Sequence, residues 1–194
     1  ALVGANEQHP ALKFARTLDP SQDAVFNVEL YTDVPKGGAK AKHDPRMFRR
    51  ANLTLSDLEA LIPELERRNA DGAGVFISVN RCAGNRCIEN VAKLRAVHAD
   101  LDDATDEQRA FLLQKLPPSI VVTSSEPNRL QLYWLLESAA LARRDEVGRI
   151  NKILAAHYGA DSAATDIARL LRAPGFRHMK YRHVDRTPTV SAEY

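Results

Sequence analysis

Hydrophobic residues recur at helical spacing in four stretches of the chain. The clearest stretch covers residues 54–69, where the apolar positions fall on one helix face. Thr54 and Asp57 form a capping-box-like start, and Gly72 ends the stretch. A helix is therefore predicted over 54–69, with a kink at Pro63 because proline lacks the amide hydrogen that a helix interior uses. The same spacing predicts three further helices, over residues 10–17, 105–116 and 141–158.

Alternating or continuous apolar runs between these helices predict the strands. Residues 119–124 and 130–136 flank a polar turn, so they are expected to pair as a hairpin. Because helices and strands interleave while hairpins are present, the pattern predicts an α+β (mixed α/β) fold, with a mixed, partly antiparallel sheet flanked by helices. The other predicted strands lie near residues 25–31, 47–51, 75–80, 95–101 and 186–192.

Composition narrows the class of protein. The 194 residues, 44% of them hydrophobic, suffice for one large domain or for two small lobes that share a site. The sequence has no apolar run of membrane-spanning length and no signal-peptide pattern, so a cytoplasmic protein without membrane contact is expected. It has no heptad pattern, so a monomer is expected. Cys82 and Cys87 have no second cysteine pair, which favours two free thiols over a zinc site.

The distribution of charge matters more than its sum. The net charge is only +2, so any nucleic-acid contact must use local basic patches. Residues 34–50 form such a patch, with six Lys or Arg among glycines and prolines. Two interpretations remain open for it: a solvated flexible loop, or an arm that contacts phosphates. The sequence has no Walker-type phosphate loop, dinucleotide fingerprint or nucleophile elbow, which argues against the enzymes that use them.

Acidic residues stand at the end of the predicted strand 95–101. Asp100 and Asp102 are two positions apart, so both side chains project from one face of an extended strand. Two converging carboxylates repel each other unless a cation lies between them, and hard oxygen ligands suit Mg²⁺ or Mn²⁺. The alternative is structural: Asp102 or Asp103 caps the following helix, and Asp100 is solvated.

Two further polar clusters follow along the chain. A third carboxylate would complete a two-metal site, and neighbouring arginines and a lysine suit a polyphosphate, whose charge they neutralise and orient. Together with the acidic strand end, these clusters indicate nucleotidyl transfer. The first cluster comprises Ser124, Ser125, Arg129 and Gln131, and the second comprises Asp161, Arg169, Arg172, His178 and Lys180.

The order and spacing of these residues resemble a known family. The chain reads DLDD at residues 100–103, SS…Q-x-YW over 124–134, and D-x₇-R-x₂-R-A-P-G-F-x-H-x-K over 161–180. This order resembles the archaeo-eukaryotic primase superfamily, and within it the RepB-like primases and primase-polymerases of plasmids, phages and prophages. The segment GAGVFISVN…RAVHADLDD is similar to the family's approach to its catalytic strand, and the resemblance covers about residues 24–183. It implies metal-dependent synthesis or extension of primers on a single-stranded DNA template during replication.

The resemblance implies roles for individual residues. Asp100, Asp102 and Asp161 stand where the family has its catalytic, metal-binding carboxylates, which implies Mg²⁺ or Mn²⁺ as the cofactor. Asp166 competes with Asp161 for the third position; its alternative role is an acid in the first turn of a helix. The positions expected to contact the incoming nucleoside triphosphate are Ser124, Ser125, Arg129, Gln131, Arg169, Arg172 and Lys180.

Gln131 departs from the pattern of many family members, which carry histidine at that position. Glutamine can donate a hydrogen bond but cannot carry charge or shuttle a proton, so a neutral phosphate contact is expected there. For the two arginines and the lysine of the second cluster, the structural alternative is ion pairing with Asp161 or Asp166.

The resemblance also implies a domain organisation and partners. Residues 1–194 are expected to form a single primase-polymerase catalytic domain, with an N-terminal lobe over about 1–93 and a metal-binding and nucleotide lobe over about 94–194. Expected partners are single-stranded DNA, nucleoside triphosphates and a replicative helicase, since the sequence has no helicase motif of its own. Two alternatives remain: a non-catalytic, primase-like DNA-binding module of replication, and a single-strand nuclease that uses the same metals.

Overall fold

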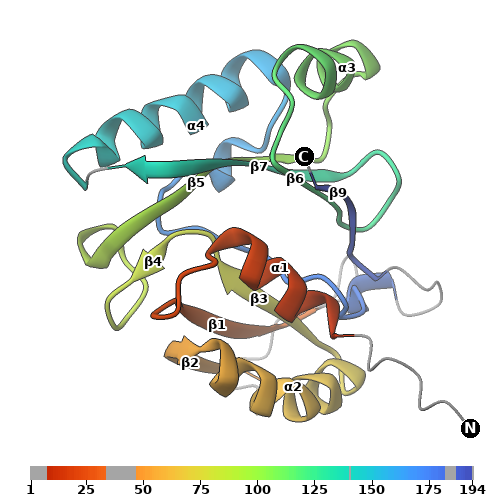
Figure 1. Ribbon diagram of the computed structural model, residues 1–194. Helices are drawn as coiled ribbons and strands as arrows, with labels where there is room; N and C mark the ends of the chain where they lie inside the picture. The colour runs from red at the N-terminus through yellow and green to blue at the C-terminus, as the bar shows by residue number, and fades with distance from the viewer. Residues whose placement is uncertain (1–7, 34–46, 140, 182–186, 194) are drawn as a thin grey trace, which may run out of the picture.

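The computed structural model describes residues 8–33, 47–139, 141–181 and 187–193, which form two β-sheets with helices between and outside them (Figure 1). Every strand pair in it is antiparallel. The predicted α+β class with hairpins is therefore confirmed. Most of the basic patch 34–50 lies outside the described residues, so both interpretations of it stay open.

The first sheet has the strand order β2-β1-β3-β8. The predicted strands near 25–31, 47–51 and 75–80 are β1 (Val25–Thr32), β2 (Phe48–Thr54) and β3 (Ala73–Ser78). The last strand, β8 (Leu170–Arg172), comes from the C-terminal half of the chain and pairs with β3. Arg172 stands opposite Phe76 in this pairing. The short β8 thus carries part of the second polar cluster into the first sheet.

The second sheet has the order β4-β5-β7-β6-β9. Its long central strand, β5 (Val91–Leu101), carries the acidic residues at its end. The predicted hairpin is confirmed, because β6 (Ile120–Thr123) pairs with β7 (Leu130–Ala139). The edge strands are β4 (Arg81–Cys82) and β9 (Thr189–Glu193).

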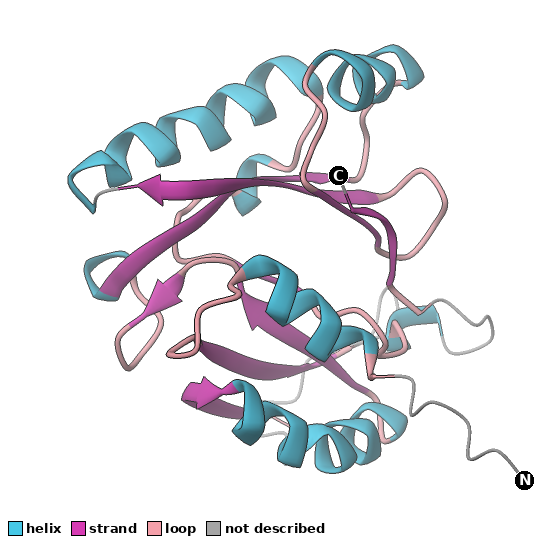
Figure 2. Cartoon of the chain, viewed as in Figure 1, coloured by secondary structure: helices cyan, strands magenta, loops and turns pink. Residues whose placement is uncertain are grey.

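In the described part of the chain, four α-helices pack around the sheets, as Figure 2 illustrates. The helix α1 (Pro10–Leu18) lies between the two sheets, and α3 (Asp106–Lys115) and α4 (Arg144–Tyr158) cover the outer face of the second sheet. The helix α2 (Leu55–Ala70) has the predicted capping box of Thr54 and Asp57 and continues through Pro63. Short 3₁₀ turns complete the chain: η1 (Ile88–Asn90), η2 (Leu141–Arg143), η3 (Ser162–Ala164) and η4 (Met179–Tyr181).

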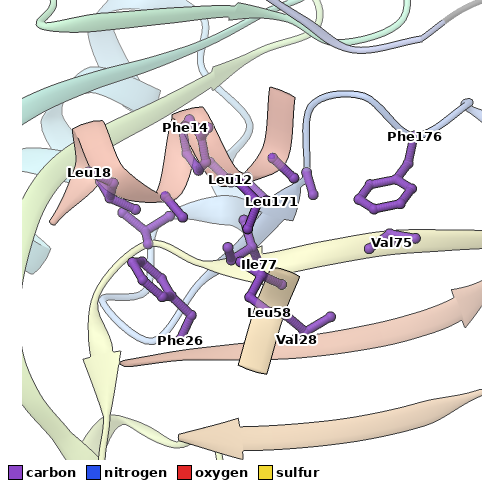
Figure 3. Close-up of a cluster of buried hydrophobic side chains, with 14 of the residues drawn as sticks. Leu12, Phe14, Leu18, Phe26, Val28, Leu58, Val75, Ile77, Leu171 and Phe176 are labelled. Atoms are coloured by element: carbon purple, nitrogen blue, oxygen red, sulfur yellow. The ribbon is translucent and has the colours of Figure 1, made fainter. Parts of the chain in front are cut away.

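The main core fills the space between α1, α2 and the first sheet, and it reaches the second sheet. Figure 3 shows Leu12 and Phe14 of α1 above Phe26 and Val28 of β1. The ring centroid of Phe14 lies 5.2 Å from that of Tyr133 on β7. A second core joins α3 and α4 to the other face of the second sheet. The two sheets are thus held in one packed unit.

Two smaller predictions can be compared with this fold. Cys82 and Cys87 are both free cysteines, as expected. Within the described ranges, the helices are all too short or too polar to cross a membrane.

Candidate active site

All of the predicted site residues line one pocket of about 250 Å³. The pocket lies where β3 and β8 of the first sheet meet β5 and β7 of the second. Its walls also include His178, which belongs to the second polar cluster, and Phe76, which sequence reasoning missed. The predicted residues that line it are Asp100, Asp102, Ser124, Ser125, Arg129, Gln131, Asp161, Arg169, Arg172 and Lys180.

The three candidate carboxylates reach this pocket from two segments. Asp100 is the penultimate residue of β5, and Asp102 follows the strand. The backbone N–H of Asp161 donates a hydrogen bond to the carbonyl of Asp100 at 2.7 Å, which holds the segment after α4 against the end of β5. The interpretation of Asp102 or Asp103 as a helix cap is wrong, because Thr105 caps α3 in a capping box.

The electrostatic environment of Asp100 is unfavourable to its charge. Burial and the neighbouring carboxylates of Asp102 and Asp161 raise the pKa of Asp100 to about 7, although Arg172 and Arg169 oppose the rise. Strongly shifted carboxyl groups in a pocket are typical of functional sites. A cation among these carboxylates would remove the repulsion that raises the pKa.

The chemistry of these side chains fits a hard divalent cation, since all three offer carboxylate oxygens. Asp102 Oδ1 lies 3.4 Å from Arg129 Nη1, and Asp161 Oδ1 accepts a hydrogen bond from the Ala163 amide at 2.8 Å. Consequently, in the part of the chain that the structure describes, no three acidic, histidine or cysteine side chains converge as metal ligands. The carboxylates share a pocket and would have to turn toward a common point.

Asp166, the competitor of Asp161, lies outside the pocket wall. It forms an ion pair with Arg169, with Asp166 Oδ2 2.5 Å from Arg169 Nη2, and it lines a separate groove beside α4. Arg169 also donates to the carbonyl of Ala163. The structural alternative for Arg169, pairing with Asp166, is therefore observed, while the arginine still lines the pocket.

Arg172 is buried and pairs with a residue that the sequence did not single out. Its Nη1 and Nη2 lie 2.8 and 2.7 Å from the two carboxylate oxygens of Asp33. The structural alternative for Arg172, ion pairing with Asp161 or Asp166, is therefore wrong, and its expected phosphate contact stays a prediction. No sequence signal marked Asp33, a single acid before the basic patch, because its partner is 139 positions away.

The turn between β6 and β7, together with the start of β7, supplies the polar residues of the first cluster. Ser124 and Ser125 are buried in the pocket wall, and the Ser124 amide donates to the carbonyl of Arg129 at 2.8 Å. Gln131 is only 2% exposed. In the amide orientation that suits its neighbours, its Nε2 and Oε1 each lie 3.3 Å from the backbone O and N of Arg172. Gln131 thus joins β7 to β8 across the two sheets, and its phosphate contact stays a prediction.

His178 contributes a neutral imidazole to the pocket. Burial and the charge of Arg172 lower its pKa to about 4, against the opposing effect of Asp33, and Lys180 lowers it further. The imidazole is therefore uncharged at neutral pH, which leaves Arg169, Arg172 and Lys180 as cations of the pocket wall beside it.

The fold is that of archaeo-eukaryotic primase domains. The chain is similar to the archaeo-eukaryotic primase (AEP) domain of the cyanophage S-2L primase-polymerase, at 14% identity and a TM-score of 0.68, over 95% of this chain and 89% of that one. Within that class, the chain belongs to the RepB DNA-primase N-terminal domain family, which residues 41–191 match.

Two crystal structures of primase RepB′ have the same fold. One contains primase RepB′, at 20% identity and a TM-score of 0.66 over 94% of this chain; the chain spans only 55% of that protein. The other contains the catalytic domain of RepB′ in complex with initiator DNA, at 19% identity and a TM-score of 0.65, over 94% of this chain and 83% of that one. A comparison with curated protein sequences gives no match.

Proposed function

We propose that the chain is a primase-polymerase domain that joins nucleotides to a 3′-hydroxyl on a single-stranded DNA template. The observation that carries the proposal is the meeting of three aspartates and several cationic side chains in one pocket. Such a pocket has complementary parts for a divalent cation and for a triphosphate. Membership of the RepB primase family supports the same reaction, and the likeness to a RepB′ domain bound to initiator DNA supports a DNA template.

Asp100, Asp102 and Asp161 are the proposed catalytic residues and the proposed ligands of Mg²⁺ or Mn²⁺. When bound, such a cation lowers the pKa of an attacking hydroxyl and offsets the charge that develops on the phosphate. The chain contributes the negative charge that attracts the cation, gathered at the end of β5 before any cation binds. Asp161 is preferred over Asp166 because only Asp161 lines the pocket beside Asp100.

The cationic residues of the pocket hold the nucleotide in this proposal. Arg169, Arg172 and Lys180 bind the β- and γ-phosphates and stabilise the pyrophosphate that leaves. Arg129 adds a cation from the β6–β7 turn, the hydroxyls of that turn add neutral contacts, and an amide on β7 adds another. The residues proposed for these neutral contacts are Ser124, Ser125 and Gln131.

The proposal keeps one catalytic domain with two lobes, over about residues 1–93 and 94–194. Within this division, β8 (Leu170–Arg172) extends from the second lobe into the first sheet, and Phe76 of the first lobe lines the pocket beside residues of the second. Single-stranded DNA and nucleoside triphosphates are the proposed partners of a monomer. Unwinding is assigned to a replicative helicase.

The direct test is primer synthesis on single-stranded DNA, with labelled nucleotides and Mg²⁺ or Mn²⁺. We expect the wild type to produce oligonucleotides and Asp100→Asn to lose at least about a hundredfold in rate, since the variant keeps the shape but loses the charge of a ligand. Asp103→Asn is the matched control, because Asp103 is an exposed neighbour that does not line the pocket. Equal losses in both variants, or none in Asp100→Asn, would show that the site is misplaced.

A non-catalytic DNA-binding module is the second candidate. It is favoured by Gln131, which lies buried against the backbone of Arg172 at the position where many relatives have histidine. A module of this kind would bind single-stranded DNA, synthesise nothing, and show no effect of Asp100→Asn on Mn²⁺ affinity. Shortened rather than lengthened DNA in the same assay would instead identify a nuclease.

A further inference from the structure

We infer that Asp33, which lies outside the predicted site, is a positioning residue that holds the phosphate-binding side of the pocket in place. The inference rests on the proposed nucleotide-binding function. It concerns a residue at the end of β1, far in sequence from every residue that the family pattern marks.

One carboxylate fixes two parts of the pocket wall at once. Asp33 is 2% exposed, and its two oxygens accept hydrogen bonds from both terminal nitrogens of Arg172. Asp33 Oδ2 also accepts from the backbone amide of Met179 at 3.1 Å. Because Met179 stands between His178 and Lys180, Asp33 anchors both the Arg172 guanidinium and the backbone that carries these two pocket residues.

Asp33 itself is held by the first sheet. Its backbone amide donates to the carbonyl of Gly72 at 3.1 Å, in the turn before β3. The carboxylate is therefore a fixed point from which the side chain of Arg172 is oriented. A bidentate carboxylate matches the planar guanidinium and restricts its rotation more than a single contact would.

Two residues of β3 also help to hold the Arg172 guanidinium in this orientation. Its Cζ lies 4.7 Å from the ring centroid of Phe76, which also lines the pocket. A Cβ added to Gly74, two positions before Phe76 on β3, would lie 2.7 Å from Arg172 Nη1 and 2.9 Å from Asp33 Oδ2. Glycine at position 74 thus leaves the room that the ion pair occupies.

The position of Arg172 explains why this orientation matters for function. Arg172 and Asp100 line the same pocket, and their charges interact. An arginine released from Asp33 would be free to pair with Asp100, where it would compete with a cation and leave the triphosphate without its donor. Asp33 prevents this by keeping the guanidinium on its own side of the pocket.

The test compares Asp33→Asn and Gly74→Ala with the wild type. Asparagine at position 33 removes the charge and one acceptor, whereas alanine at position 74 keeps every charge and displaces the ion pair. For both we expect the Kd of a labelled deoxynucleoside triphosphate with Mn²⁺, and its KM on a primed template, to rise by about tenfold or more. We expect kcat to change by less than about threefold, and the Kd for single-stranded DNA to stay the same.

Asp19→Asn is the matched control. Asp19 is as buried as Asp33 and also pairs with a buried arginine away from the pocket, although through one contact rather than two: Arg95 Nε lies 2.8 Å from Asp19 Oδ2, while Lys93 Nζ binds Asp19 Oδ1. We expect this variant to lower the melting temperature about as much as Asp33→Asn while leaving KM unchanged.

The outcomes separate this inference from the proposed function. If the wild type binds the triphosphate, but Asp33→Asn and Gly74→Ala bind it equally well and only melt earlier, Asp33 supports the fold alone and the inference fails. If the wild type neither binds the triphosphate nor extends a primer, the proposed function is wrong, and the inference that rests on it is wrong as well. If Kd and KM rise in both Asp33→Asn and Gly74→Ala but not in Asp19→Asn, the inference is supported.

Discussion

The buried Asp19 and the half-buried Asp100 show how one residue type serves two purposes in this chain. Burial alone would raise the pKa of both. At Asp19, hydrogen bonds from Lys93 and two further side chains outweigh burial and hold the pKa well below its usual range. At Asp100, neighbouring carboxylates add to the effect of burial, and the pKa rises to about 7. A satisfied ion pair stabilises the fold, whereas unrelieved repulsion marks a place for a cation.

His178 gives a prediction at the same scale. Its pKa is lowered to about 4 in the fold, below the value of about 6.5 expected when unfolded. Between these values the unfolded chain binds a proton that the folded chain does not, so stability present above pH 6.5 is lost as the pH falls toward 4. We expect His178→Asn to weaken this loss, by up to about 1.4 kcal/mol per pH unit over that interval. Denaturant unfolding at pH 7, 6 and 5 measures the difference.

A second buried histidine, His98, provides a comparison for His178 within the same chain. His98 is fully buried, and its pKa is also lowered to about 4, chiefly by burial. His98 stays intact in the variant, so part of the pH dependence should remain. An unchanged pH dependence in His178→Asn would mean that the pKa of His178 is not lowered by folding.

At the scale of elements, local sequence signals predicted those elements whose hydrogen bonds join residues close together in the chain. The capping box at Thr54 and the glycine that ends α4 were both readable, and Gly159 has φ +71°. The strand β8 was missed, because three residues carry no periodicity and pair only with the distant β3. The structural alternative that placed a helix cap at Asp102 or Asp103 overlooked Thr105, which forms a capping box with Gln108 at the start of α3.

Gly159 allows a prediction about how α4 positions the site. Its φ is positive, and an added Cβ would lie 2.9 Å from the backbone Cα of Ala104, in the segment that follows Asp102. We expect Gly159→Ala to lower stability by about 1–3 kcal/mol and to reduce primer synthesis, because it would push Asp161 away from Asp102. Unfolding curves and synthesis rates at saturating template measure both effects.

Gly148 within α4 is the control for that substitution. An added Cβ there would meet Ile167 Cγ2 at an ordinary 3.6 Å. Gly148→Ala should therefore raise stability, by up to about 1 kcal/mol, without changing synthesis. If Gly159→Ala lost stability but kept full activity, the end of α4 would have no part in positioning the third carboxylate.

At the scale of the whole molecule, the site exists only when both sheets are in place. The sequence predicted which residues meet in the pocket because the family pattern fixes their order, and all of them do line it. It could not predict Asp33, whose partner lies 139 positions away on a strand with no pattern of its own. Gln131 likewise acquires its contact with Arg172 only when β7 and β8 approach. Contacts between the sheets are therefore what the sequence alone leaves undetermined.

A cation held by Asp100, Asp102 and Asp161 would tie the end of β5 to the segment after α4, so its binding should stabilise the whole fold. At a concentration of about 100 times its Kd, a ligand of the folded state adds about 2.7 kcal/mol, or roughly 5–10 °C in melting temperature for a domain of this size. We expect Mn²⁺ to raise the Tm of the wild type by this order and to have little effect on Asp161→Asn. Thermal melts with Mn²⁺ and with EDTA measure it.

Asp166→Asn separates the two candidates for the third carboxylate. Asp166 pairs with Arg169 and lies outside the pocket wall, so this variant should keep the Mn²⁺ shift even if its baseline Tm falls. If the Mn²⁺-induced rise in Tm were lost in Asp166→Asn and retained in Asp161→Asn, Asp166 rather than Asp161 would be the third carboxylate. A wild type that melts at the same temperature with Mn²⁺ and EDTA would instead show that the carboxylates of this pocket do not bind the cation at all.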